Sequence, residues 1–204
     1  NLTDDLPVLL VFGGSKGARS INRALTVSLP ALLELAQVVH LSGQLDWEDV
    51  QATAENLPEH LAGRYRPFPY LHEEMGAALA SAALVVSRAG ASALGELPLF
   101  GLPAVLVPYP YAWRYQKINA EYLAQRGAAV IVEDQHLVDQ LVPTVSALLA
   151  SQDKLSQMRR AMQALSRPNA ARDIANLLRE LAALPARKGK RTPWEGSMSF
   201  SGCW

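Results

Sequence analysis

Three stretches of the sequence place small or polar residues directly after an apolar run, where a parallel sheet presents its binding loops. In the first, "VLLVFGGSKGARSIN", the apolar residues 8–12 end at Gly13, Gly14 and Ser15. Glycine lets the backbone approach a ligand closely, and a helix starting after Gly17 directs N–H groups and its positive dipole end at an anion. The stretch predicts a phosphate-binding turn, with a purely structural glycine turn as the alternative. It has neither the GxxxxGK[ST] frame of a P-loop nor the GxGxxG frame of a dinucleotide fold.

The second stretch, "SRAGASALGE" at residues 87–96, repeats this arrangement and adds a carboxylate. Gly90 separates an apolar run from a helical pattern whose first residues are Ala91, Ser92 and Ala93. Their N–H groups would face an anion, and Glu96 lies in the first turns of the same helix. Because a carboxylate beside a phosphate site accepts hydrogen bonds from a ribose in dinucleotide folds, we expect Glu96 to bind a ribose diol. Simple compensation of the helix dipole is the alternative.

The third stretch, "PYPYAWRYQKINA" at residues 108–120, leaves a predicted strand and enters a helix. Gln116 and Asn119 are three residues apart and therefore share one helix face. Two carboxamides offer paired donors and acceptors, which suit the hydroxyl groups of a sugar. Ordinary loop polarity is the alternative explanation.

The elements that must position these loops alternate along the chain. Apolar, β-rich runs are separated by amphipathic segments, which favours a parallel sheet with right-handed crossovers. The sequence therefore predicts an α/β fold with a doubly wound, Rossmann-like sheet of six strands. Their expected ranges are 8–12, 37–43, 65–70, 83–90, 103–110 and 128–134. We also expect Pro30 to kink or break the first helix and Asp46 to cap the second.

Composition narrows the class of protein. Of 204 residues, 50% are hydrophobic and 19% are charged, as in a globular chain with a proper core. The 19 basic and 19 acidic residues balance, so net charge argues neither for nor against nucleic acid. Cys203 is the single cysteine, which excludes an intrachain disulfide and suits a reducing cytoplasm. Neither a signal peptide nor an apolar run of membrane-spanning length is present, and a chain beginning at Asn1 rather than Met suggests a fragment.

The last twenty or so residues differ in character from the rest. We expect a domain over residues 1–184 and a poorly ordered tail over 185–204, which is basic at first and then rich in Ser and Gly. The basic residues are Arg187, Lys188, Lys190 and Arg191. They suit anionic lipid or RNA, with a merely solvated tail as the alternative.

Taken together, these motifs resemble the C-terminal half of the MurG family, bacterial transferases that add N-acetylglucosamine (GlcNAc) to the lipid-linked muramyl-pentapeptide precursor of peptidoglycan. The resemblance covers about residues 7–183, with matching segments in the family's order: "GGSKGARSIN", "HLSG", "LHEEM", "SRAGASALGE", "GLPAVLVPYPYA" and "QKINAEYL". It implies the C-terminal domain of a GT-B glycosyltransferase, in which two Rossmann-like domains face each other across a cleft. This half would bind UDP-GlcNAc, and we expect it to use no cofactor and no metal.

The resemblance also implies roles for individual residues. Gly14, Ser15 and the following amides would contact the diphosphate, and the backbone of His72, with Met75 nearby, would contact the uracil. The remaining assignments are the diphosphate and sugar for Gly90, Ala91, Ser92 and Ala93, the ribose diol for Glu96, and GlcNAc hydroxyls for Gln116 and Asn119. The sequence departs from the family pattern where Ala93 replaces a usual Thr and Tyr115 replaces a frequent His. Trp113 and Arg114 also replace smaller or acidic residues, so the sugar geometry is open.

The family's N-terminal acceptor domain has no counterpart in this sequence. None of the four histidines, His40, His60, His72 and His136, is an obvious general base, so we expect that base in the missing half. The implied partners are UDP-GlcNAc or UDP, and a lipid-linked acceptor bound through the missing domain, without nucleic acid. The intact enzyme would work peripherally at the membrane surface, on the cytoplasmic face of the bacterial plasma membrane.

Three alternatives differ in function. The chain could be a nucleotide-sugar-binding subunit that needs a separate acceptor-domain partner, or a donor-site remnant without activity. A nicotinamide dehydrogenase is a further alternative, but the sequence lacks the GxGxxG turn and an acidic residue at the end of the second strand.

Overall fold

A computed structural model describes residues 2–3, 5–14, 16–111 and 115–183 of the chain. The chain divides into two units, residues 1–167 and 168–204. The expected division at residue 184 stays a prediction, because the tail at 185–204 lies outside the described residues. Ser15, Trp113 and Arg114 also lie outside the described residues, so what the sequence predicts for them stays a prediction.

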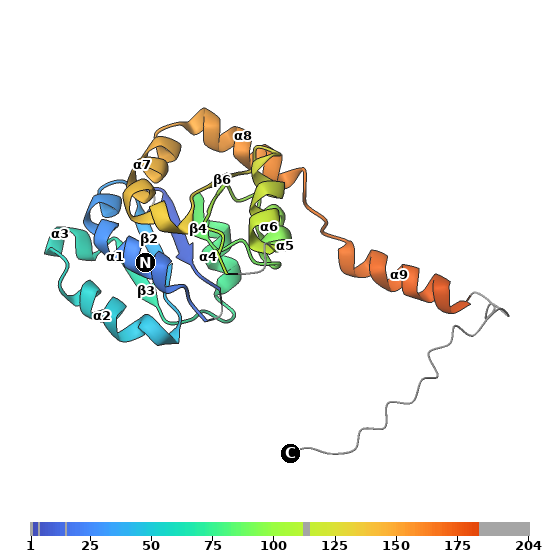
Figure 1. The fold of residues 1–204 in the computed structure, drawn as a ribbon, viewed down its shortest axis with the longest axis horizontal. Coiled ribbons are helices and arrows are strands. Elements are labelled where there is room, and N and C mark those ends of the chain that lie inside the picture. Colours follow the sequence, from blue (N-terminus) through green and yellow to red (C-terminus); the bar gives the residue numbers. More distant parts are fainter. Residues whose placement is uncertain (1, 4, 15, 112–114, 184–204) are drawn as a thin grey trace, which may run out of the picture. The chain divides into compact units, whose positions relative to one another are not determined.

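The first unit alternates strands and helices (Figure 1). Its strands are β1 (Val8–Phe12), β2 (Gln37–Leu41), β3 (Tyr65–Phe68), β4 (Leu84–Ser87), β5 (Ala104–Leu106) and β6 (Ala129–Ile131). Its α-helices are α1 (Arg19–Leu33), α2 (Trp47–Glu55), α3 (Glu59–Ala62), α4 (Met75–Ser81), α5 (Ala93–Phe100), α6 (Tyr115–Ala124), α7 (Leu137–Leu149) and α8 (Gln152–Gln163). Short 3-10 turns, η1 (Gln44–Asp46) and η2 (Asp134–His136), precede α2 and α7.

The strands form one parallel sheet in the order β3-β2-β1-β4-β5-β6. At its centre β1 pairs with two neighbours, so that Leu10 lies opposite Val39 of β2 and Val85 of β4. This confirms the predicted doubly wound α/β fold. β1 has its predicted range, and the other five strands are shorter than predicted, because the ends of those runs lie in the loops that flank the sheet.

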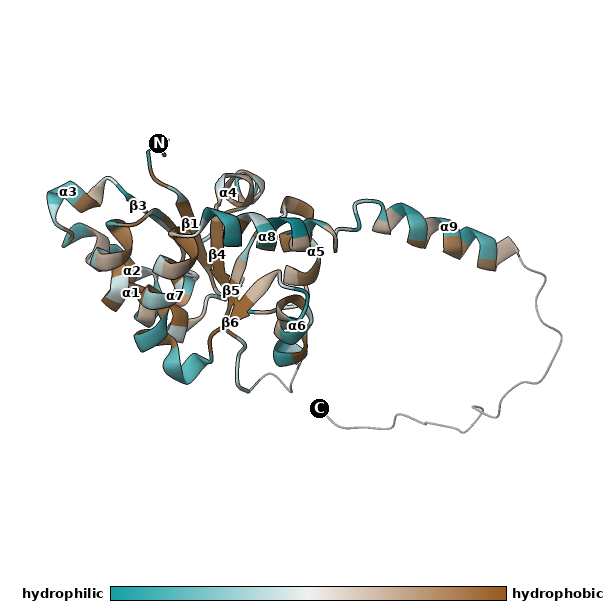
Figure 2. Cartoon of the chain, turned by 90° about the horizontal axis from the view of Figure 1, so that it is seen from above, coloured by the Kyte–Doolittle hydropathy of each residue, from teal (hydrophilic) through white to brown (hydrophobic). Residues whose placement is uncertain are grey.

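Helices cover both faces of the sheet, and alternate side chains of β1 enter two separate cores. Leu9 and Val11 pack with residues of α1 and α7, while Val8 and Leu10 pack with residues of α4, α5 and α6. The central strands β1, β4 and β5 are correspondingly coloured as hydrophobic in Figure 2. Burial on both faces explains why β1 reads as an unbroken apolar run rather than an alternating one.

The structure contradicts a break at Pro30 and a side-chain cap by Asp46. Helix α1 continues through Pro30, which is exposed, because Leu29, Leu32 and Leu33 are fully buried and hold the last turns by packing. At the start of α2, Asp46 occupies the cap position but makes no side-chain capping bond. Its carboxylate instead accepts hydrogen bonds from the side chains of Arg19 (3.0 Å) and Asn22 (2.8 Å).

A buried polar chain runs from β3 through β2 to α1. The amide group of Asn22 donates to the carbonyl of Ser42 and to Asp46, both at 2.8 Å, so its Oδ1 is left as an acceptor. The Nε2 of His40, 3.0 Å away, must therefore carry the proton, and its Nδ1 accepts from the hydroxyl of Tyr65 at 2.8 Å. Burial lowers the pKa of His40 to about 4, although the negative charge of Asp46 opposes the shift.

The second unit contains helix α9 (Ala170–Ala183), none of whose residues is buried. Four of its apolar side chains are exposed: Ile174, Leu177, Leu178 and Leu181. In the described part of the chain, no helix combines the length and apolar character needed to cross a membrane.

The neutral state of His40 makes the stability of the fold sensitive to acid. Between pH 6.5 and about 4 the unfolded chain takes up a proton at this residue and the folded chain does not. The free energy of unfolding should therefore be highest above pH 6.5 and fall by about 3 kcal/mol as the pH approaches 4. Urea unfolding across this range measures the slope.

His40→Gln should flatten that pH dependence, although it lowers stability at pH 7.5 by disturbing the buried chain. His60→Gln serves as the control, because His60 is exposed. Identical pH slopes for the parent and His40→Gln would show that this histidine does not cause the acid sensitivity.

Candidate functional site

The three glycines of the turn after β1 differ in their surroundings. A Cβ at Gly13 would lie 2.3 Å from the backbone nitrogen of Ala18, and one at Gly17 would lie 2.1 Å from the carbonyl oxygen of Ser42. These two glycines therefore allow close packing within the protein. Gly14 has φ +95°, and a Cβ there would meet nothing within 4 Å among the described residues. Its backbone faces open space, as a ligand contact requires.

A cavity of about 260 Å³ brings together four of the residues that the sequence assigned to the donor. These are Gly14, Met75, Ser92 and Glu96, which come from the turn after β1, the start of α4 and the first turns of α5. Apolar residues complete its wall: Phe12, Leu41, Pro69, Tyr70 and Leu71. The cavity thus combines an apolar end, a carboxylate and a glycine turn at the carboxyl edge of the sheet.

The histidine of "LHEEM" points elsewhere. The side chain of His72 lines a neighbouring cavity of about 600 Å³ and lies against the ring of Tyr70, with ring centroids 4.7 Å apart. Tyr70 and Leu71 line both this cavity and the smaller one. His72 does not line the smaller cavity, and the uracil contact that the family resemblance implies for its backbone stays a prediction.

At the start of α5 the predicted residues lie together but differ in exposure. Ala91 and Ser92 are exposed, whereas Ala93 is buried in the core and its N–H donates to the carbonyl of Gly90 at 3.2 Å. The methyl group of Ala93 thus contributes packing rather than a polar contact. Ser92 supplies the hydroxyl that lines the small cavity.

The two predicted carboxamides hold backbone groups in this structure. The Oε1 of Gln116 accepts from the N–H of Tyr109 at 2.9 Å, and the Nδ2 of Asn119 donates to the carbonyl of Ala89 at 2.9 Å. Gln116 lines a cavity of about 650 Å³ on the other side of the glycine turn, and Asn119 lines neither this cavity nor the small one. Each carboxamide keeps its second polar atom available for a ligand, since no described residue bonds to it.

Charges favour an anion at this larger cavity. Three cationic and two acidic side chains line it: Lys16, Arg19, Arg88, Asp46 and Asp134. Arg19 pairs with Asp46 at 3.0 Å and Arg88 with Asp134 at 2.5 Å. Within the described ranges Lys16 has no acidic partner, so one positive charge is uncompensated beside the glycine turn.

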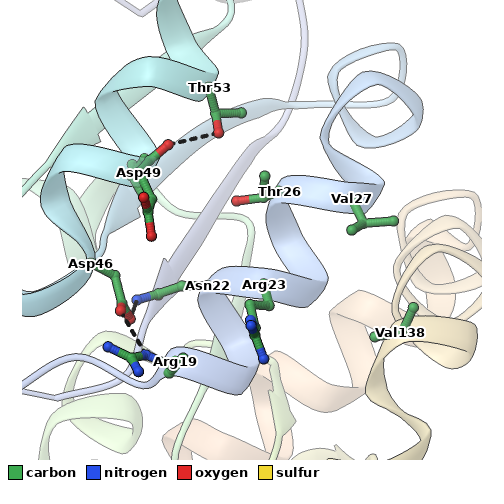
Figure 3. A pocket seen from close by; sticks show the side chains of 10 residues that line it. Arg19, Asn22, Arg23, Thr26, Val27, Asp46, Asp49, Thr53 and Val138 are labelled. Carbon is green, nitrogen blue, oxygen red and sulfur yellow. Dashed lines mark hydrogen bonds and ion pairs between the residues drawn. The ribbon is translucent and has the colours of Figure 1, made fainter.

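A separate hollow of about 500 Å³ opens between α1 and α2 (Figure 3). Figure 3 shows Arg19 and Asn22 converging on Asp46 at one end, and Thr53 bonded to the backbone of Asp49 at the other. None of the residues assigned to the donor lines it.

Among the residues that the structure describes, the remaining titratable side chains do not assemble a metal centre. Over the described ranges, no group of three or more His, Cys, Asp or Glu side chains could hold a metal ion. His40 is buried with both ring nitrogens bonded, and His60 in α3 and His136 in η2 are exposed. These three histidines therefore sit in structural or surface positions.

Sequence reasoning missed a set of polar residues below the larger cavity. Arg88, Ser20 and Asp134 contact one another there. The stretches singled out from the sequence contain Ser20 and Arg88 but assigned no role to either, and they do not contain Asp134. The one signal in the sequence was an arginine placed directly after a buried strand, a position where a charge needs a partner.

Known proteins resemble this chain over most of its described length. The model of the glycosyltransferase family 28 C-terminal domain matches residues 8–177. Two curated proteins, from Roseiflexus sp. (strain RS-1) and Desulforamulus reducens, are named UDP-N-acetylglucosamine–N-acetylmuramyl-(pentapeptide) pyrophosphoryl-undecaprenol N-acetylglucosamine transferase. They are 46% and 41% identical to this chain over 88% of its length, which corresponds to 45% and 50% of their own. The crystal structure of Acinetobacter baumannii MurG superimposes with a TM-score of 0.73 at 29% identity, covering 88% of this chain and 51% of that one. The chain thus spans about half the length of the relatives it matches.

The packing of the glycine turn can be tested by one substitution. Gly17→Ala places a methyl group against Ser42 at a position with φ +76°, so it combines backbone strain with overlap. We expect it to lower the free energy of unfolding by about 3 kcal/mol, measured by urea denaturation.

Gly90→Ala is the matched control, because a Cβ there meets nothing within 4 Å among the described residues and φ is not positive. It should cost less than about 1 kcal/mol. Equal losses in both variants would contradict the close approach of the two turns.

Proposed function

Because this chain belongs to the glycosyltransferase family 28 C-terminal domain family, we propose that it is the donor-binding half of a transferase. In the whole protein, GlcNAc would pass from UDP-GlcNAc to undecaprenyl-pyrophosphoryl-muramyl-pentapeptide in peptidoglycan synthesis. The names of the curated relatives support this donor and this acceptor. The observation that carries the proposal is the cavity shared by Gly14, Met75, Ser92 and Glu96.

The donor would bind across the carboxyl edge of the sheet. Leu71 and Met75 line the small cavity and would pack against the uracil ring. The backbone of His72, the residue after Leu71, would supply the polar contacts to the uracil. The carboxylate of Glu96 would accept both hydroxyls of the ribose. Its place in the same cavity as the glycine turn favours this role over simple compensation of the helix dipole.

The diphosphate would lie where two turns meet. The open backbone of Gly14 would supply an N–H group from one side, and Gly90, Ala91 and Ser92 would supply them from the other, with the dipole of α5 behind them. Ser15 lies outside the described residues, and its contact with the diphosphate stays a prediction. Ala93 would contribute through the helix it begins rather than through its side chain. When the acceptor hydroxyl attacks the anomeric carbon, these fixed donors and the charge of Lys16 would stabilise the negative charge that develops on the departing UDP.

The sugar would extend toward the larger cavity. Gln116 lines that cavity and keeps its amide nitrogen available, and Asn119 keeps its carbonyl oxygen. Because both are also anchored to backbone groups, they would present fixed polar atoms to the GlcNAc hydroxyls. We place the general base in the other half of the whole protein. None of His40, His60 and His136 lies at these cavities, and the side chain of His72 lines a different one.

The acceptor in the relatives' names carries an undecaprenol chain, and a lipid of that kind resides in a membrane. We therefore propose that the whole protein acts peripherally at the membrane surface, on its cytoplasmic face, where soluble UDP-GlcNAc is available.

Calorimetry with UDP and 2′-deoxy-UDP tests the site. The chain should bind UDP, and Glu96→Ala should weaken that binding by about 10- to 100-fold, since a hydrogen bond to a charged group contributes about 1.5–3 kcal/mol. Toward 2′-deoxy-UDP the loss should be much smaller, because the deoxy ligand already lacks one of the two hydrogen bonds.

Glu55→Ala provides the control, as Glu55 is an exposed glutamate of α2 away from the cavities. A folded chain that binds neither UDP nor UDP-GlcNAc would overturn the proposed function, and tight NADH binding in its place would indicate a dehydrogenase. If only Glu96→Ala bound UDP like the parent, the ribose assignment alone would be wrong.

A further inference from the structure

A compact polar cluster lies at the floor of the larger cavity. Arg88, whose side chain is only 9% exposed, pairs with Asp134 at 2.5 Å and donates to the hydroxyl of Ser20 at 2.7 Å. The hydroxyl of Ser20 donates in turn to Asp134, also at 2.7 Å. The three side chains close a triangle between the end of β4, the first turn of α1 and the turn after β6.

The same arginine also holds the loop after β5. Its Nη1 donates to the carbonyl of Val107 at 3.0 Å, and its guanidinium carbon lies 5.1 Å from the centre of the Tyr109 ring. Tyr109 in turn donates its N–H to Gln116. Arg88 therefore contacts the loop on one side, and the proposed sugar-binding carboxamide contacts it on the other.

A second connection runs along the backbone. Ala89, the residue after Arg88, accepts a hydrogen bond from Asn119 through its carbonyl. Gln116 thus bonds to Tyr109, whose ring Arg88 contacts, and Asn119 bonds to Ala89, the residue after Arg88. The nucleoside end of the site has no such link, because none of the three cluster residues lines the small cavity that holds Glu96.

We propose that Arg88, Asp134 and Ser20 are positioning residues for sugar recognition. They fix the loop 107–111 and through it the orientation of Gln116, so that this part of the site is formed before the donor binds. The buried guanidinium can hold the loop because Asp134 compensates its charge, which would otherwise be costly to bury. This inference rests on the proposed function, which supplies the sugar as the ligand.

A purely structural ion pair would behave differently. It would affect binding of UDP and UDP-GlcNAc equally, through stability alone. A positioning role predicts a selective effect on the ligand that carries the sugar, together with a looser loop in the absence of any ligand.

Three variants test the role by calorimetry. Asp134→Ala should raise the Kd for UDP-GlcNAc about tenfold while changing the Kd for UDP less than about twofold, because it frees Arg88, whose other contacts are with Val107 and Tyr109 of the loop. Asp134→Asn should lie between Asp134→Ala and the parent, since its amide oxygen still accepts from Arg88 and Ser20. Ser20→Ala should have the smallest effect, because it leaves the ion pair in place.

Tyr65→Phe is the control for lost stability. It removes the buried bond to His40 far from the loop, and its ratio of UDP-GlcNAc to UDP affinity should equal that of the parent. If Tyr65→Phe changed that ratio as much as Asp134→Ala does, or if Asp134→Ala left it unchanged, the positioning role would be wrong.

Hydrogen exchange without ligand separates this inference from the proposed function. The N–H groups of Val107 and Tyr109 are bonded to Ser87 and Gln116, and in Asp134→Ala they should exchange at least about fivefold faster. A parent that binds no UDP would refute the proposed function, while faster exchange would still support the hold on the loop. Unchanged exchange in Asp134→Ala would refute that hold whatever the ligand result.

Discussion

Strand β1 hydrogen-bonds to β2 on one side and to β4 on the other, and each feature of the candidate site depends on that double pairing. The chain leaves β1 toward one edge of the sheet and later returns to build the opposite edge. The turns after β1 and β4 therefore diverge around a gap at the carboxyl ends of the strands, the position at which doubly wound sheets bind ligands. The small cavity with Glu96 and the larger cavity with Gln116 lie on the two sides of the β1 turn.

Backbone contact keeps that turn in place. Gly17 approaches the carbonyl of Ser42 so closely that no side chain fits, and the turns after β1 and β2 consequently support each other. Beneath them the buried chain from Tyr65 through His40 to Asn22 ends on Ser42 and Asp46. Since each polar group in this row of hydrogen-bonded side chains has a partner, the turn is held without leaving an unsatisfied group in the core. Gly14 is then free to present its backbone to the cavity.

In our proposal this chain is the part of the whole protein that recognises a nucleotide sugar. It spans about half the length of the curated relatives it matches. The contribution to catalysis that we propose for it is to hold the donor and to stabilise the leaving diphosphate with fixed dipoles. Residues that activate the acceptor belong, in our proposal, to the other half. The exposed apolar side chains of α9, such as Leu177 and Leu178, show that this helix is amphipathic without a buried face of its own.

The sequence by itself determined the doubly wound sheet, the two glycine-containing turns and the family, because these depend on apolar runs and short motifs that are local along the chain. It also identified Glu96 as a candidate ligand-binding residue, because the ten residues 87–96 contain both the glycine turn and the start of the helix that carries this glutamate. Only the tertiary structure decided which glycine packs against the protein and which faces a ligand. It alone joined Ser20, Arg88 and Asp134, which are separated by 68 and 46 residues. Contacts between such distant residues depend on how helices and loops pack onto the finished sheet, and no local pattern records that packing.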